Sequence, residues 1–147
     1  AYKGIPLVAA VAVALDRLGR NVPFLFNRKE AKDHGEGGVL VGAEPKGRIL
    51  IVDDVISAGI SVRESVQAIR AAGAIPCGVV IALDRMERGV GDLSAVQEVE
   101  LTYGMPVLSV SKLDDLVKYL SQRPEMGPNL LAVEAYRANY GVVHVAS

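Results

Sequence analysis

The 147-residue chain lacks tryptophan, contains one cysteine and carries a net charge of −1. A single cysteine, Cys77, cannot form a disulfide within the chain, which excludes a small disulfide-stapled domain and fits a reducing cytoplasm. Its apolar neighbours predict that Cys77 is a core residue rather than a nucleophile. The 16 basic and 17 acidic residues leave no surplus positive charge for a general nucleic-acid-binding surface.

Long hydrophobic runs are also missing. The longest, residues 5–15, is well short of the roughly 20 residues that a membrane-spanning helix needs, so we expect no membrane segment. Hydrophobic residues nonetheless make up 50% of the chain. In a chain of this length that content favours one α/β domain, residues 1–147, with a buried sheet.

Apolar strands alternate with amphipathic helices along the chain. We expect strands near residues 22–26, 39–42, 49–52, 75–83 and 105–110, and helices near residues 6–18, 61–72, 93–103 and 129–140. A further helix is expected with Ser111 as its N-cap and Asp114 at its third helical position. The alternation predicts an α/β fold with a mainly parallel central sheet flanked by helices. The first helix has almost no polar residues and should be buried on most sides.

Residues 49–61 carry the most specific pattern. Four apolar residues predict a buried strand that ends at two neighbouring carboxylates, Asp53 and Asp54. A turn of small residues that includes Gly59 leads into a helix. Glycine allows close backbone approach, and the free N–H groups and dipole of a helix start favour an anion. Acids beside an anion site suit a ligand that also offers hydroxyls or a metal cation, as a ribose phosphate does. Alternatively, the two acids only end the strand.

This stretch resembles the phosphoribosyl-pyrophosphate (PRPP) binding motif of type I phosphoribosyltransferases. The resemblance implies that Asp53 and Asp54 hold the ribose hydroxyls, while the following turn wraps the 5′-phosphate. The implied turn residues are Val55, Ile56, Ser57, Ala58, Gly59, Ile60 and Ser61. The family usually has a hydroxyl residue where Ile60 stands, and we expect Ser61 to replace it in part.

The segment Ala1-Tyr2-Lys3-Gly4 lies just before a predicted helix start. Taken alone, these residues favour a solvated lysine near a chain end over an anion site. The segment closely resembles the short pyrophosphate-contacting loop of orotate phosphoribosyltransferases, which implies PRPP contacts for Tyr2 and Lys3. In that family a core strand and an N-terminal hood precede the loop. We expect both to be missing here, which would expose one side of the sheet.

Residues 27–38 are polar and rich in glycine, and predict a mobile basic loop. Such a segment is usually only solvated, although a basic loop can also close over a polyanion. Its Arg-Lys-Glu-x-Lys-x-His-Gly pattern resembles the catalytic loop of orotate phosphoribosyltransferases. The resemblance implies that Lys32 and His34 contact pyrophosphate across a homodimer interface, assisted by Arg28 and Lys29.

Arg85 follows the strand near 75–83 and should face the same rim as Asp53 and Asp54. Its guanidinium suits a planar carboxylate held by two hydrogen bonds, but a surface pair with Glu87 or Asp84 is equally compatible with the sequence. The Leu-Asp-Arg-x-Glu-Arg-Gly pattern resembles the same family. It implies that Arg85 binds orotate and that Ser57 lies near the base.

Taken together, the resemblances imply transfer of the phosphoribosyl group from PRPP to orotate, giving orotidine 5′-monophosphate and pyrophosphate. They imply a cytoplasmic homodimer that uses Mg²⁺, held mainly through PRPP rather than by direct protein ligands. The implied catalytic residues are Lys32, His34, Asp53 and Asp54. Two alternatives remain open: a phosphoribosyltransferase for another base, and a non-catalytic PRPP-sensing domain.

Overall fold

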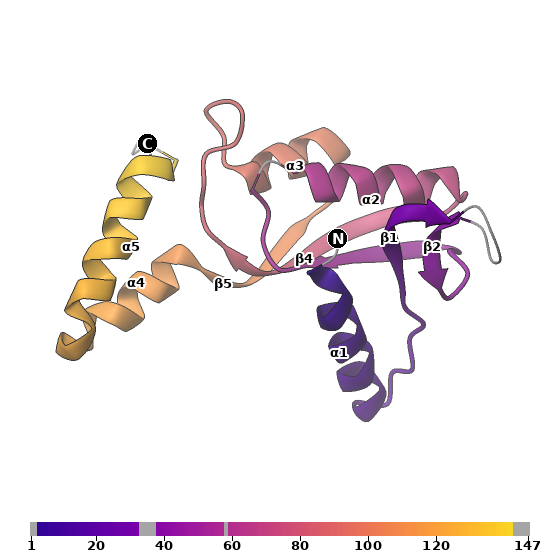
Figure 1. The fold of residues 1–147 in the computed structure, drawn as a ribbon, viewed down its shortest axis with the longest axis horizontal. Coiled ribbons are helices and arrows are strands. Elements are labelled where there is room, and N and C mark those ends of the chain that lie inside the picture. Colours follow the sequence, from indigo (N-terminus) through magenta and orange to yellow (C-terminus); the bar gives the residue numbers. More distant parts are fainter. Residues whose placement is uncertain (1–2, 33–37, 58, 143–147) are drawn as a thin grey trace.

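A computed structural model describes residues 3–32, 38–57 and 59–142, with the backbone alone at residues 28–32, 38 and 39. At its centre lies a three-stranded parallel sheet in the order β3-β4-β5 (Figure 1). These strands span Arg48–Asp53, Ile75–Asp84 and Val107–Lys112. The mainly parallel α/β fold expected from the sequence is therefore confirmed.

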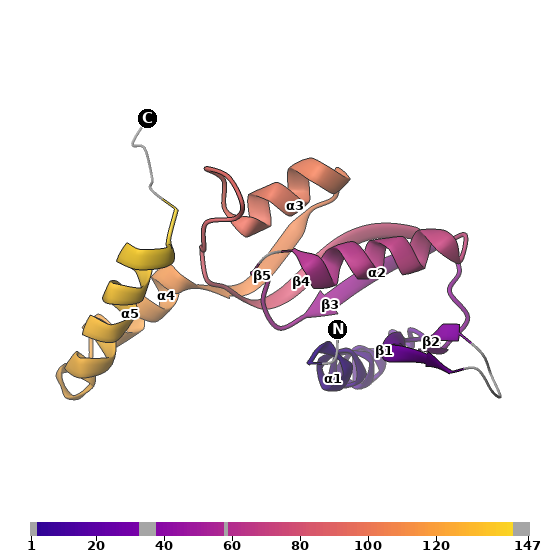
Figure 2. The same ribbon diagram turned by 45° about the horizontal axis from the view of Figure 1, so that its top comes forward.

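Helices lie on both sides of this sheet. Figures 1 and 2 show α2 (Ile60–Ala71) and α3 (Ala95–Tyr103) over one face, and α1 (Gly4–Arg17) beside β3 on the other. Beyond the end of β5, α4 (Leu113–Ser121), the short helix η1 (Pro124–Met126) and α5 (Gly127–Tyr140) pack on one another, away from the sheet. None of the helices in the described ranges is long and apolar enough to cross a membrane.

The core lies between the sheet and α2. Helical spacing puts Val62, Val66 and Ile69 on the face of α2 that is buried. They belong to one apolar cluster with residues of β3, β4 and α3, namely Ile51, Val79, Ile81, Ala95 and Val99. Cys77 is free and only half-buried, and it is not part of this cluster, so the expectation of a core position is wrong.

The opposite face of the sheet is open in part. Leu108 and Val110 of β5 are 64% and 81% exposed, since alternate residues of a strand point to opposite faces. The expectation that α1 is buried on most sides is wrong for this chain. Val13 is 55% exposed, and Gly4 is the one residue of α1 that is fully buried. Helix α1 touches mainly β3 and β1, so much of its apolar surface has no neighbour in the described chain.

Strands β1 (Leu25–Lys32) and β2 (Gly38–Gly42) form an antiparallel ribbon outside the main sheet. The ribbon extends into the segment predicted to be a loop, residues 27–38, because Asn27 pairs with Leu40 and Lys32 with Gly38. Backbone hydrogen bonds join such a ribbon, so polar residues do not prevent it. The register shifts between Asn27 and Lys32. Residues 33–37 lie outside the described chain.

The helix ends follow local capping. Ser94 accepts a hydrogen bond from Gln97 N at the start of α3, and Gly104 ends it in a left-handed conformation. The expected helix start at Ser111 is wrong, because Ser111 continues β5. The N-cap of α4 is instead Lys112, one residue later, and the carboxylate of Asp115, not Asp114, accepts from Lys112 N at 2.8 Å.

We expect Val79→Ala to lower the free energy of unfolding by about 2 kcal/mol, through lost burial and the cavity left behind. Val79 of β4 is 1% exposed in the core that the sheet forms with α2, whereas Val90 is 92% exposed in a loop. Urea unfolding of the two variants measures the difference. Val90→Ala is the matched control and should change stability by less than about 0.5 kcal/mol. Equal losses would contradict the position of the core.

Candidate active site

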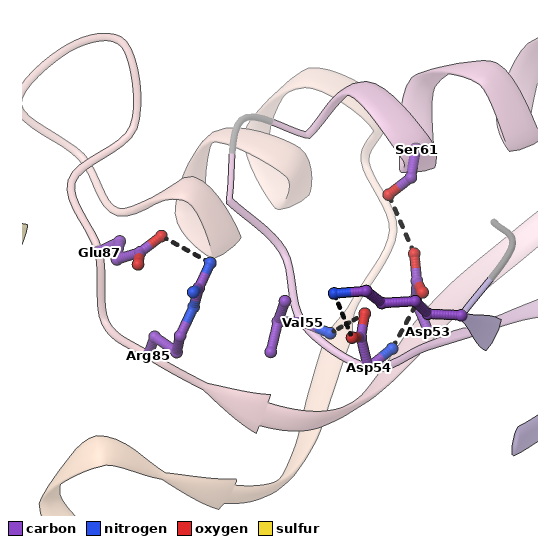
Figure 3. A network of polar contacts seen from close by, with 7 residues as sticks. Asp53, Asp54, Val55, Ser61, Arg85 and Glu87 are labelled. Atoms are coloured by element: carbon purple, nitrogen blue, oxygen red, sulfur yellow. Dashed lines mark hydrogen bonds and ion pairs between the residues drawn. The ribbon is translucent and has the colours of Figure 1, made fainter.

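Asp53 joins the end of β3 to the start of α2. Its Oδ2 accepts a hydrogen bond from Ser61 Oγ at 2.9 Å, and its Oδ1 accepts from Asp54 N at 3.0 Å (Figure 3). The residue is 4% exposed. Both carboxylate oxygens therefore already have donors inside the protein. A ribose hydroxyl could reach Asp53 only beside these donors or in exchange for one of them.

Asp54 is the more open of the two acids. Its Oδ1 accepts from Val55 N at 2.9 Å, while its Oδ2 lies 3.9 Å from Lys3 Nζ. The side chain of Asp54 is 35% exposed and that of Lys3 is 79% exposed. Asp54 thus keeps an accessible oxygen next to a cation, and its backbone carbonyl accepts from Ala82 N and Leu83 N. These last bonds fix Asp54 against β4.

The start of α1 reaches this rim through a close backbone approach at Gly4. A Cβ at Gly4 would lie 2.8 Å from Val52 O and 3.3 Å from Asp53 Oδ1. Real Cβ atoms do not approach a carbonyl oxygen so closely, so only glycine fits without a shift. The sequence segment around Lys3 and the acidic pair are therefore neighbours in space, as the two motifs require. Tyr2 lies outside the described residues.

The turn between β3 and α2 leaves the helix start open. Gly59 is the N-cap in a left-handed conformation with φ 64°, and no side chain caps α2. Free N–H groups at such a start can hold an anion. Ser57 is exposed and Ile60 is 52% exposed, whereas Ile56 is 4% exposed within the core. Ile56 can therefore contact a ligand through its backbone alone, and Ala58 lies outside the described residues.

Ser61 has only one hydroxyl proton, and that proton is donated to Asp53. While this bond exists, Ser61 cannot also donate to a phosphate. The expected replacement of a hydroxyl residue at position 60 by Ser61 therefore competes with the support of Asp53. In this geometry the turn offers an anion backbone N–H groups rather than the hydroxyl of Ser61.

Arg85 follows β4 on the side of the sheet where the Asp53 turn lies, with Val55 between them in Figure 3. Its Nη2 donates to Glu87 Oε2 at 3.1 Å, so the pairing with Glu87 left open by the sequence is formed. The Glu87 side chain is 14% exposed and that of Arg85 is 31% exposed. Among the described residues, Arg85 Nε is a buried side-chain donor without a hydrogen-bond partner.

The basic residues expected to act on pyrophosphate are only partly placed. The backbones of Arg28, Lys29 and Lys32 lie in β1, and His34 lies outside the described residues. Among the described side chains, no cluster of His, Cys, Asp and Glu could hold a metal ion.

Two supports of this rim were missed by sequence reasoning. Asp84 Oδ1 accepts from Met86 N at 2.8 Å, and Val142 N donates to Met86 O at 3.1 Å. The first is a local turn that an Asp after a strand makes possible. The second joins residues far apart in the chain, and no local pattern indicates it.

Relatives of known name agree with this arrangement, although no family model matches the chain. Over 142 residues, which are 97% of the chain, it is 66% identical to the orotate phosphoribosyltransferase of Chromobacterium violaceum and covers 66% of that protein. It is also 66% identical to the enzyme of that name from Thiobacillus denitrificans, of which it covers 67%. The chain thus spans about two thirds of the length of these curated relatives.

Solved structures show the same relationship. The crystal structure of orotate phosphoribosyltransferase from Francisella tularensis matches with a TM-score of 0.75 at 33% identity, covering 96% of this chain and 65% of that chain. The one from Aeropyrum pernix, at 24% identity and a TM-score of 0.56, supports the fold alone. The fold is that of a phosphoribosyltransferase. The chain belongs to the orotate phosphoribosyltransferase family.

We expect Ser61→Ala to lower the free energy of unfolding by about 1–3 kcal/mol, because it removes a donor from a buried carboxylate. The matched control is Ser65→Ala, one helical turn further on, whose hydroxyl donates to Ser61 O. The Ser61 carbonyl lies within the helix and does not depend on this hydroxyl, so loss of the Ser65 hydrogen bond should change the free energy of unfolding by less than about 0.5 kcal/mol. Urea unfolding of both variants tests the bond, and equal effects would count against it.

Proposed function

We propose that the complete protein transfers the phosphoribosyl group of PRPP to orotate, giving orotidine 5′-monophosphate and pyrophosphate. One observation carries the proposal: Lys3, the acidic pair and the open start of α2 come together at the end of β3. These groups offer a cation, hydroxyl acceptors and backbone donors within one rim. A sugar that bears a 5′-phosphate and a pyrophosphate needs all three.

The roles follow from exposure and charge. The N–H groups at the start of α2 bind the 5′-phosphate, and Asp54 accepts a hydrogen bond from a ribose hydroxyl. Asp53 orients the turn through its hydrogen bond with Ser61. It accepts a hydrogen bond from the ribose when the bond from Ser61 breaks. As pyrophosphate departs, positive charge grows at the sugar ring and negative charge on the leaving group. The carboxylates stabilise the first charge, and Lys3 with the cations of β1 stabilises the second.

Mg²⁺ fits this site as an ion that is coordinated mainly by PRPP rather than by side chains of the protein. The oxygens of Asp53 already accept hydrogen bonds, while Asp54 keeps an accessible oxygen. When bound, the ion would neutralise part of the pyrophosphate charge. The protein's own task is to fix the sugar and exclude alternative positions.

We also propose that the chain works as a cytoplasmic homodimer in which the segment 27–38 of one subunit reaches the site of the other. The exposed apolar residues of α1 are compatible with an additional covering surface. The lone free Cys77 is compatible with a reducing compartment. In this proposal residues 1–147 supply the catalytic domain.

Base choice is assigned to Arg85. Orotate carries a carboxylate that uracil and the purine bases lack, and a guanidinium recognises it by paired hydrogen bonds. The unpartnered Arg85 Nε supports this role, since a carboxylate oxygen would satisfy a buried donor. A PRPP-sensing domain without catalysis would not require such a group.

The experiment that tests the function measures PRPP consumption by the complete protein with orotate, uracil or hypoxanthine. We expect turnover with orotate alone. Arg85→Gln should lower kcat/KM for orotate by about 10- to 100-fold, because hydrogen bonds to a charged partner are lost. The matched control is Arg88→Gln in the same loop, whose side chain is exposed and which should behave like the wild type. Turnover with uracil, or a failure to use any of the three bases, would overturn the proposal.

A second variant tests the stabilisation of the leaving group. Lys32→Ala should lower kcat by about 100-fold while the dissociation constant for PRPP changes far less, because the charge acts as pyrophosphate departs. Lys46 is paired with Glu44 on the surface and is 73% exposed, so Lys46→Ala is the control. Pre-steady-state kinetics and a binding titration separate the two quantities. Equal losses in both would contradict a leaving-group role.

A further inference from the structure

The loop that carries Arg85 is held from two distant parts of the chain. On one side, Ala95 N at the start of α3 donates to Glu87 O at 3.0 Å. On the other, the segment 140–142, which consists of the last residue of α5 and the two residues after it, pairs with the loop. Arg88 N donates to Tyr140 O at 2.8 Å, Val142 N donates to Met86 O at 3.1 Å, and Glu87 and Gly141 form an antiparallel bridge.

Glu87 lies at the centre of this pairing, since the two bonds to the segment come from the residues on either side of it. Its carboxylate in turn accepts from Arg85 Nη2 at 3.1 Å (Figure 3). A carboxylate that is 14% exposed has few alternative positions, so the backbone of Glu87 determines where the Arg85 guanidinium lies. The loop needs such support because Met86 has a left-handed backbone with φ 53°, which is unfavourable for a residue other than glycine.

We propose that the segment 140–142 is a positioning element for base recognition, and that it acts on Arg85 through Glu87. The proposal rests on the function proposed above and adds residues that touch no substrate. The paired backbone holds Glu87, Glu87 holds the guanidinium, and the guanidinium meets the carboxylate of the base. Loss of the pairing should therefore weaken the use of orotate and leave the use of PRPP unchanged.

Val142→Pro tests the pairing in the complete protein, because proline lacks the N–H that is donated to Met86 O. The preceding Gly141 has φ −69° and ψ 158°, an extended conformation that a following proline favours. Val142→Ala keeps the N–H and is the matched control. We expect Val142→Pro to raise KM for orotate about three- to tenfold, with KM for PRPP unchanged, and Val142→Ala to match the wild type.

A second pair of variants tests the link through Glu87 and decides the question if Val142→Pro does not fold. Glu87→Ala should raise KM for orotate about tenfold, and Glu87→Gln, which keeps an acceptor for Arg85, should restore part of it. An unchanged or lower KM for orotate in Glu87→Ala overturns the inference.

If the wild type is active but Val142→Pro and Val142→Ala have the same KM for orotate, the inference is also overturned. An equal rise in KM for orotate and for PRPP in Val142→Pro overturns it as well. A wild type that transfers nothing to orotate instead overturns the proposed function, so the two failures are distinguishable.

Discussion

The hydrogen bond between Ser61 and Asp53 fixes the geometry on which the site depends. It spans the turn between β3 and α2, so the strand end and the helix start cannot separate without leaving a buried carboxylate unsatisfied. Because α2 is packed on the sheet by Val62 and Val66, the turn is held from both ends. The open N–H groups beyond Gly59 are thus presented by a rigid frame rather than by a free loop.

Close contacts between main chains explain how Lys3 and Asp54 are held next to the turn between β3 and α2. Gly4 lies against Val52 and Asp53, and this contact places the start of α1 at the acidic rim. Asp54 is tied to β4 through its carbonyl, which relates the rim to the strand that leads to Arg85. The charged groups of the site therefore keep their relative positions through main-chain contacts, while their side chains stay partly free for a ligand.

Local patterns predicted β3, β4, α2 and the position of the acidic pair, since apolar periodicity, Asp53 and Gly59 are visible in the sequence. Local patterns failed where contacts between residues far apart in the chain determine the structure. The antiparallel ribbon includes polar residues such as Asn27 because only backbone bonds are needed there. Asp115, rather than Asp114, accepts the hydrogen bond at the start of α4, because β5 runs two residues beyond Val110, to Lys112. The burial of Asp53 and the pairing of Glu87 with Gly141 depend on tertiary contacts that no single segment encodes.

The left-handed backbone of Met86 has a consequence for how the enzyme can change over time. A residue that tolerates this conformation, such as glycine or asparagine, would relax the loop at position 86, whereas a β-branched residue would tighten the conflict. Replacement of Met86 would change the position of the neighbouring Arg85 guanidinium and leave the guanidinium itself unchanged. Under the role proposed for Arg85, position 86 is therefore a site at which substitutions change substrate preference through the backbone rather than through the arginine itself.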